Sequence, residues 1–207
     1  MDHDEDQTAE IAEKYSMKDK RIRVIHNTEN KKLPESLNIG FADAVGDFYT
    51  WTSDDNAYRA DAFEIMQNAL DRNRDVDIVF CDYTIIDSKD YMICDMVAGP
   101  IEELPLENTM GASFLYRKEV HSGLSGYDTN KFLVEDYDFW LRAYWKYHFL
   151  HLDEAPYYYR VHASTLTARR KKEISDATKK LLCENIQKIS DEELKQRVRQ
   201  KIEKLSE

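Results

Sequence analysis

Short apolar runs rich in β-branched residues alternate with amphipathic stretches through the first half of this chain. Strands are expected over 22–26, 48–52 and 76–81, and helices over 8–15, 34–45 and 59–70. Such alternation is typical of an α/β domain, in which a largely parallel sheet carries helices on its faces. The sequence therefore predicts an α/β fold.

The second half has a looser pattern that ends in a helical tail. A hairpin is expected around 87–91, within a segment (83–108) that is long enough to cover a substrate. Further elements are expected as strand 112–116, helix 118–124, helix 135–147 and extended chain over 149–161. The tail (173–205) predicts two helices, with Ser190 as the cap of the second.

Bulk composition excludes several classes of protein. The chain has 207 residues and a formal net charge of −11, which argues against binding nucleic acid through its phosphates. Its three cysteines are widely spaced and predict neither a disulfide framework nor a zinc site, so a reducing compartment is expected. The N-terminus is acidic where a signal peptide would be basic, and no apolar stretch has the length of a membrane span. A cytoplasmic protein with one main domain is expected.

The first acidic cluster, Ser53-Asp54-Asp55-Asn56, follows the strand expected over 48–52. Mg²⁺ or Mn²⁺ bound through one or two carboxylates keeps positions for diphosphate oxygens and water. In open α/β sheets, ligands bind beyond the carboxyl ends of strands, which is where this cluster is expected. The alternative is a turn or helix-capping sequence, because all four residues favour turns.

The second acidic cluster, Glu135-Asp136, opens an amphipathic helix. Asp136 is the candidate general base that removes a proton from an attacking hydroxyl, and Glu135 is its substitute. The alternative is that these carboxylates and Asp138 only favour a helix N-terminus through the macrodipole.

Several segments resemble the family 2 glycosyltransferases. The first three are Arg21-Ile-Arg-Val-Ile-His-Asn27, Leu33-Pro-Glu-Ser-Leu-Asn-Ile-Gly-Phe41 and Ala44-Val-Gly-Asp-Phe-Tyr-Thr-Trp-Thr-Ser-Asp-Asp55. The later ones are Gly126-Tyr-Asp128, Glu135-Asp-Tyr-Asp-Phe-Trp-Leu-Arg142 and Tyr159-Arg-Val-His162, in the order that the family has. The resemblance implies a GT-A fold and an inverting sugar transfer. We expect the GT-A domain over residues 1–168 and a helical extension over 169–207.

The resemblance also implies ligands and residue roles. The donor would be a nucleotide-diphosphate sugar, with a UDP-sugar favoured, and the cofactor Mn²⁺ or Mg²⁺. Asp54, Asp55 and His162 would hold the metal, while Asp54, Arg160 and His162 would contact the donor diphosphate and Asp2 its base. The alternative for His162 is a polar surface or capping residue. The acceptor would be a saccharide or lipid-linked saccharide, in polysaccharide or cell-surface glycan synthesis.

Two departures from the family pattern open rival interpretations. Thr52 stands where many relatives have an aspartate, and the N-terminus resembles only the end of the family's first strand-helix-strand unit. The chain therefore looks truncated, and a non-catalytic remnant or binding module unable to hold a nucleotide is the main alternative. Unpaired strands would also favour a homo-oligomer. A nucleotidyltransferase is a weaker alternative, because no Gly-rich triphosphate loop is present.

A basic run, Arg169-Arg170-Lys171-Lys172, precedes the tail helices. A solvated start of a helix is the favoured interpretation. The alternative is peripheral contact with the anionic inner face of a membrane.

Overall fold

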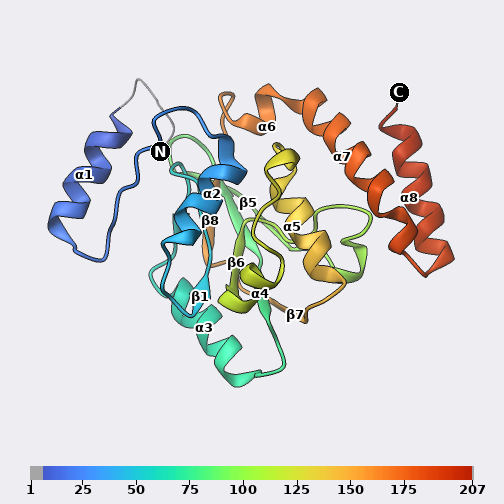
Figure 1. Cartoon of the computed structure of the whole chain (residues 1–207), viewed down its shortest axis with the longest axis horizontal. Coiled ribbons are helices and arrows are strands. Elements are labelled where there is room, and N and C mark those ends of the chain that lie inside the picture. Colours follow the sequence, from blue (N-terminus) through green and yellow to red (C-terminus); the bar gives the residue numbers. More distant parts are fainter. Residues whose placement is uncertain (1–6, 207) are drawn as a thin grey trace.

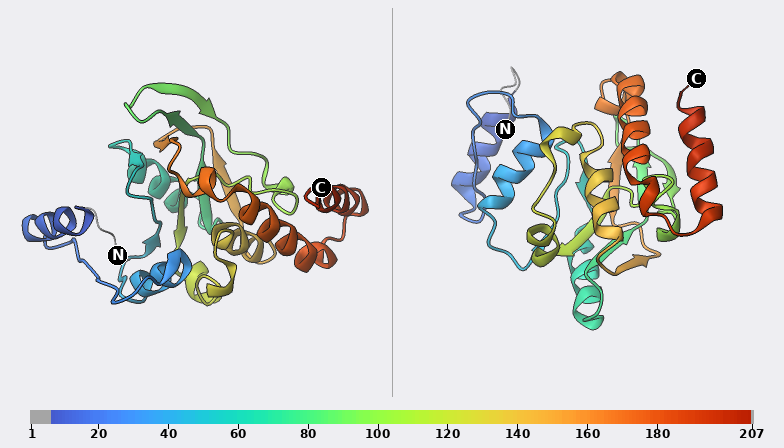
Figure 2. Two further views of the ribbon diagram at one scale, coloured as in Figure 1. Left: turned by 90° about the horizontal axis from the view of Figure 1, so that it is seen from above. Right: turned by 45° about the vertical axis from the view of Figure 1, so that its right-hand side comes forward.

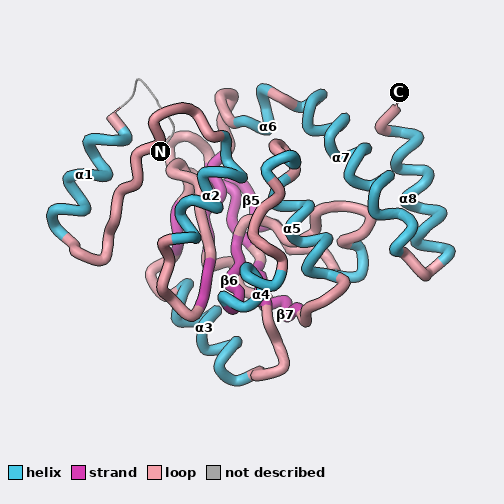
Figure 3. The backbone as a smooth tube through the Cα atoms, viewed as in Figure 1, coloured by secondary structure: helices cyan, strands magenta, loops and turns pink. Residues whose placement is uncertain are grey.

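Two four-stranded sheets form the centre of the computed structural model, which describes residues 7–206 (Figures 1 and 3). The first contains, in order across the sheet, β1 (Phe48–Tyr49), β6 (Ser113–Arg117), β3 (Ile78–Cys81) and β7 (Phe149–Leu152). The second contains β2 (Ala57–Tyr58), β8 (Tyr157–Arg160), β4 (Tyr83–Ile86) and β5 (Met92–Met96). The predicted α/β class is confirmed.

The prediction of a largely parallel sheet is wrong for the described residues. Only the pairs β3–β7 and β4–β8 are parallel, whereas β1–β6, β3–β6, β2–β8 and β4–β5 are antiparallel. After β3 the chain turns back through the β4–β5 hairpin, and β6 then enters the first sheet from the opposite end. β6 therefore separates β1 from β3 and runs against both.

Helices surround the two sheets. They are α1 (Thr8–Lys18), α2 (Lys32–Ala42), α3 (Ala62–Arg72), α4 (Lys118–Gly123), α5 (Glu135–Tyr144), α6 (Leu166–Arg169), α7 (Lys171–Asn185) and α8 (Glu192–Lys204). α3 buries Ala62, Met66 and Leu70, which lie four residues apart and so share one helical face. α1 buries none of its residues and lies at the opposite end of the molecule from α8 (Figure 2). No described helix has the length and apolar character that crossing a bilayer requires.

The main core is aromatic and is built around α5. Phe139 and Trp140 are fully buried, and their rings lie 4.5 Å from Tyr127 and 4.7 Å from Phe114 respectively. Such ring pairs add about 0.5–1.5 kcal/mol each beyond the burial of their area. Leu181, Leu182, Ile189 and Val198 of the tail belong to the same core cluster. The tail therefore packs against α5, and the division at residue 168 stays a prediction.

Three local predictions compare differently with the structure. The hairpin around 87–91 is confirmed, with the Asp87 amide donating to the Tyr91 carbonyl at 2.9 Å. The prediction of a strand over 22–26 is wrong, because these residues belong to neither of the two described sheets. The cap of α8 is Asp191 and not Ser190, since Asp191 directly precedes the helix and accepts from the Leu194 amide at 2.7 Å.

Candidate active site

A cavity of about 820 Å³ lies between the loop after β1, the start of α5 and the segment after β8. The structure brings five of the sequence-predicted residues to its wall, namely Asp54, Asp55, Glu135, Asp136 and His162. Two clusters that are about eighty positions apart in the sequence therefore share one space. Asp2 lies outside the described residues.

The acidic loop, residues 53–56, is held by the strand that ends at Arg160. The Asn56 side-chain oxygen accepts from the Arg160 amide at 2.8 Å, and Asp55 Oδ2 lies 3.1 Å from His162 Nε2. Asp55 Oδ1 is buried and has no hydrogen-bond partner among the described residues. A buried carboxylate oxygen without a partner loses its hydration, so a positively charged ligand at this oxygen would stabilise it.

These residues fit a divalent cation that is shared with a phosphate ligand. The described residues contain no group of three or more His, Cys, Asp or Glu side chains arranged as a metal site. Asp55 and His162 supply one oxygen and one nitrogen ligand, and Asp54 is exposed beside them. Mg²⁺ and Mn²⁺ commonly take one or two carboxylates and complete their shell with phosphate oxygens and water. The donor set therefore suits such an ion once a diphosphate is present.

Arg160 does not line the cavity, and its expected contact with the donor diphosphate stays a prediction. Its Nε donates to the Asp55 carbonyl at 2.8 Å and one terminal nitrogen donates to the Asp87 carbonyl at 2.9 Å. The same nitrogen lies 2.7 Å from an Asp90 oxygen. Because these protein groups occupy the guanidinium, Arg160 ties the acidic loop to the β4–β5 hairpin.

Asp136 is half-buried in the first turn of α5. Its Oδ1 accepts from the Tyr137 amide at 2.7 Å, and its Oδ2 accepts from Asn108 Nδ2 at 3.0 Å. Burial raises the pKa of Asp136, and these hydrogen bonds oppose that shift. A carboxylate with a raised pKa accepts a proton more readily, which suits a general base. Asn108 was not expected from the sequence, because its partner lies 28 positions away.

Glu135 lies beside Asp136 and is nearly inaccessible to solvent. Burial, followed by the charge of Asp136, raises the pKa of Glu135 to about 7. Its Oε2 is buried and has no hydrogen-bond partner within residues 7–206. Since one carboxyl of the pair titrates near neutrality, the pair can hold a proton at physiological pH.

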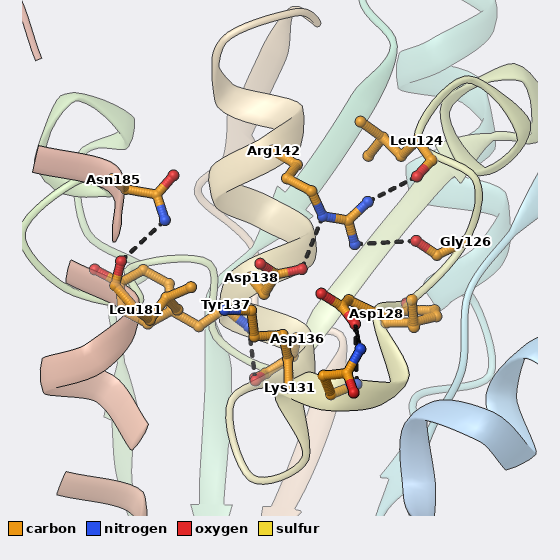
Figure 4. A network of polar contacts seen from close by, with 12 residues as sticks. Leu124, Gly126, Asp128, Lys131, Asp136, Tyr137, Asp138, Arg142, Leu181 and Asn185 are labelled. Carbon is orange, nitrogen blue, oxygen red and sulfur yellow. Dashed lines mark hydrogen bonds and ion pairs between the residues drawn. The ribbon is translucent and has the colours of Figure 1, made fainter. Parts of the chain in front are cut away.

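The start of α5 is connected to the other cavity wall through Arg142 and Tyr127. Figure 4 shows the Arg142 guanidinium donating to Asp138 at 2.7 Å and to the Leu124 and Gly126 carbonyls at 2.8 and 3.0 Å. Tyr127 is held by Asn38 of α2, which makes hydrogen bonds of 2.8 Å to both its amide and its carbonyl. The Tyr127 hydroxyl in turn accepts from Trp51 Nε1 at 2.8 Å, and Trp51 lines the cavity.

The turn that carries Tyr127 requires a glycine at position 126. Its φ is +71°, and a Cβ there would lie 2.5 Å from the Asn38 side-chain oxygen. Any other residue would displace Asn38 and strain the turn.

The segment after β8 forms a wall that the sequence did not predict. Thr165, Leu166, Arg169 and Arg170 line the cavity, and the Thr165 hydroxyl caps α6 by accepting from the Ala168 amide at 3.2 Å. The only signals were a threonine at the start of a short helix and the basic run. Arg169 and Arg170 are exposed, as the solvated interpretation expects, but they also face the site.

Comparison with protein families decides the membership of the chain. Residues 1–134 match the family model described as Glycosyl transferase family 2. The chain belongs to the family 2 glycosyltransferases. The resemblance noted in the sequence is confirmed.

Curated relatives agree with this family. EpsH of Bacillus subtilis is 28% identical over 189 residues, which cover 83% of this chain and 54% of EpsH. The glycosyltransferase GlyG of Streptococcus pneumoniae is 26% identical over 108 residues, covering 51% of this chain and 36% of GlyG. The chain thus spans about half or less of the length of these glycosyltransferase relatives.

Solved structures confirm the GT-A fold of this family 2 glycosyltransferase. S. aureus TarS in complex with UDP-GlcNAc superposes with a TM-score of 0.73 at 17% identity, covering 95% of this chain and 59% of TarS. The mannosyltransferase PcManGT from Pyrobaculum calidifontis, in complex with GDP-Man and Mn²⁺, has a TM-score of 0.64 at 14% identity. This superposition covers 88% of this chain and 52% of PcManGT.

Proposed function

We propose that this chain transfers a sugar from a nucleotide-diphosphate donor to a saccharide hydroxyl, with inversion at the anomeric carbon and with the help of a divalent cation. The observation that carries the proposal is that Asp55 and His162 line the same cavity as Asp136. The GDP-Man, Mn²⁺ and UDP-GlcNAc complexes of the structural neighbours support this class of donor and metal. We favour a UDP-sugar with Mn²⁺ or Mg²⁺.

On the donor side, Asp55 and His162 would hold the cation, with Asp54 as a further ligand. When bound, the cation offsets the charge that develops on the leaving diphosphate. The buried, unpartnered Asp55 Oδ1 supports this role, because a metal–oxygen contact would replace its lost hydration.

On the acceptor side, Asp136 would take the proton of the attacking hydroxyl. The hydroxyl oxygen forms a bond to the anomeric carbon from the face opposite the diphosphate, and the bond from that carbon to the diphosphate oxygen breaks. The proton remains on the Asp136 carboxyl. The hydrogen bond from Asn108 orients that carboxyl, and one positioned carboxylate is sufficient for a single displacement with inversion.

The acceptor would be a saccharide or lipid-linked saccharide, and the product part of a polysaccharide or cell-surface glycan. Peripheral contact with a membrane, self-association and a cytoplasmic location stay predictions.

Titration calorimetry with UDP and GDP, with and without Mn²⁺, tests the proposal. Wild-type protein should bind one of the two nucleotides in a Mn²⁺-dependent manner, and Asp55→Ala should abolish that binding. Asp75→Ala is the matched control, because it removes an exposed carboxylate that does not line the cavity. Metal-dependent binding that survives Asp55→Ala would reject the metal assignment. A wild-type protein that binds neither nucleotide would favour the non-catalytic alternative.

A further inference from the structure

Two cations line the cavity and a third, Lys32, lies over the same aromatic ring as one of them, although the chain as a whole has a net charge of −11. Lys32 Nζ lies 5.2 Å and the Arg170 guanidinium 5.6 Å from the centre of the Phe132 ring. Arg170 and its neighbour Arg169 line the cavity. We call Lys32, Arg169 and Arg170 the basic rim. Two cations from different helical segments thus converge on one aromatic ring.

The backbone beside Phe132 is held in an unfavourable conformation. Leu133, which lines the cavity, has a φ of +79°, and Lys32 has a φ of +60°. The Lys32 amide donates to the Asn30 side-chain oxygen at 2.9 Å, which holds this conformation. Non-glycine residues in the left-handed region each cost on the order of 1–3 kcal/mol, and such residues cluster at ligand sites. The position of Lys32 over Phe132 is therefore held against strain.

The charges of the basic rim are largely uncompensated. Arg170 has one ion-pair contact, with Glu173 at 3.4 Å. In the part of the chain that the structure describes, neither Lys32 nor Arg169 forms an ion pair. Uncompensated cations beside a concave surface concentrate anions there, even on a protein of negative net charge.

The ring beneath Lys32 and Arg170 belongs to the segment that leads into the candidate base. Phe132 and Leu133 are separated from Glu135 and Asp136 by Val134 alone, and Leu133 lines the cavity together with Arg170. The donor diphosphate would be met by the cation at Asp55 and His162. A second anionic group, belonging to the acceptor, would account for cations over the segment that leads to Asp136.

We propose that the acceptor is an anionic saccharide, with a phosphate or carboxylate group close to the hydroxyl that receives the sugar. Lys32 and Arg170 bind this group, with Arg169 beside them. Arg170 can engage two oxygens of either anion at once, whereas Lys32 acts as a point charge. This inference rests on the proposed function, since it names the acceptor of the same reaction.

Glycosides that differ only at C6 test the inference. Each sugar is offered in three forms: with a neutral hydroxymethyl group, with a 6-phosphate and with a 6-carboxylate. Binding is measured by calorimetry, and transfer is measured with the donor that the nucleotide titration selects. Wild-type protein should prefer at least one anionic form to its neutral counterpart by roughly tenfold or more, the effect expected of a charge-assisted contact. The two anionic arms distinguish a phosphate from a carboxylate.

Substitutions in the basic rim should remove this preference. The double variant Lys32→Gln/Arg170→Gln should bind anionic and neutral forms equally, while Arg170→Lys should retain part of the preference because it keeps the charge. Lys172→Gln is the matched control, since it removes a neighbouring positive charge that does not line the cavity.

Three results would overturn the inference. In the first, the wild-type protein shows no preference for an anionic form. In the second, the double variant keeps the wild-type preference. In the third, the double variant loses as much affinity for UDP as for the anionic glycoside. The third would assign the basic rim to the donor. A failed UDP titration with the anionic preference intact would instead count against the proposed function alone.

Discussion

The two walls of the cavity carry carboxylates in contrasting surroundings. The acidic loop is open to solvent at Asp54 and depends on contacts with His162 and Arg160, more than 100 positions along the chain. The Glu135–Asp136 pair begins a helix that is buried in the aromatic core, and burial raises both pKa values. Water and phosphate can complete the shell of a cation at the first wall, whereas the second wall favours proton uptake. Carboxylates on the two walls thus suit different tasks, cation binding on the first wall and proton uptake on the second, because their surroundings differ.

The largest expected effect comes from removing the proposed base, Asp136, at the buried wall. Asp136→Asn should lower the rate of sugar transfer by about 10²–10⁴-fold, the usual contribution of a general base, and leave Mn²⁺-dependent UDP binding intact. UDP release and calorimetry measure the two quantities. Asp153→Asn, at a side chain that is 96% exposed, is the control. Near-normal turnover in Asp136→Asn would transfer the base role to Glu135.

The next largest effect concerns the stability of the same wall. Arg142→Ala leaves the carboxylate of Asp138, which is 7% exposed, without its partner, and it also removes the donors to the Leu124 and Gly126 carbonyls. Breaking a buried pair in this way should lower the free energy of unfolding by about 3–5 kcal/mol, measured by urea denaturation. Arg197→Ala, which breaks an exposed pair with Glu103, should cost less than about 1 kcal/mol. Equal losses in the two variants would contradict the contrast.

A smaller effect should appear in the pH dependence of stability. Burial raises the pKa of Glu135 to about 7 in the folded protein, against its ordinary value of 4.5 in the unfolded chain. The stabilisation is therefore fully present below pH 4.5 and is lost as the pH rises through 7, by on the order of 3 kcal/mol. Unfolding free energies are measured at about pH 4 and about pH 8, on either side of the titration. Glu135→Gln should abolish the loss of stability between these two pH values. Parallel pH profiles for wild type and variant would show that burial does not perturb Glu135.

The smallest effect concerns the connection between the walls. Tyr127→Phe removes the acceptor of Trp51 Nε1 without changing the ring. The unfolding free energy should fall by about 0.5–1.5 kcal/mol, the net value of a hydrogen bond. If the connection positions the acidic loop, UDP affinity should fall as well. A change in stability alone would limit Tyr127 to a structural role.

The sequence predicted those parts of the fold and site that depend on local chemistry. The periodicity of the residues after Glu135 predicted a helix because an amphipathic pattern is local, and the two acidic clusters pointed to two functions. The direction of β6 was not predictable, because it depends on the path through the β4–β5 hairpin. The strand expected over 22–26 failed for a related reason, since an apolar run forms a strand only when a partner pairs with it.

Within the site, Arg160 is the residue whose partners the sequence did not predict. Its chemistry suits a diphosphate, and in the structure its Nε contacts the Asp55 carbonyl while one terminal nitrogen contacts the Asp87 carbonyl and Asp90. The partners lie 70 or more positions away in the chain, so no local pattern reveals them. For the basic run, the sequence showed the positive charge, but it did not predict that Arg169 and Arg170 line the cavity.

Anomalous diffraction from crystals grown with UDP and Mn²⁺ tests most directly that one cavity holds both the cation and the base. We predict a manganese peak within about 2.0–2.6 Å of an Asp55 carboxylate oxygen, inside the cavity that Asp136 lines, with the diphosphate oxygens completing the shell. A peak at any other carboxylate, or bound UDP without manganese at Asp55, would contradict this account.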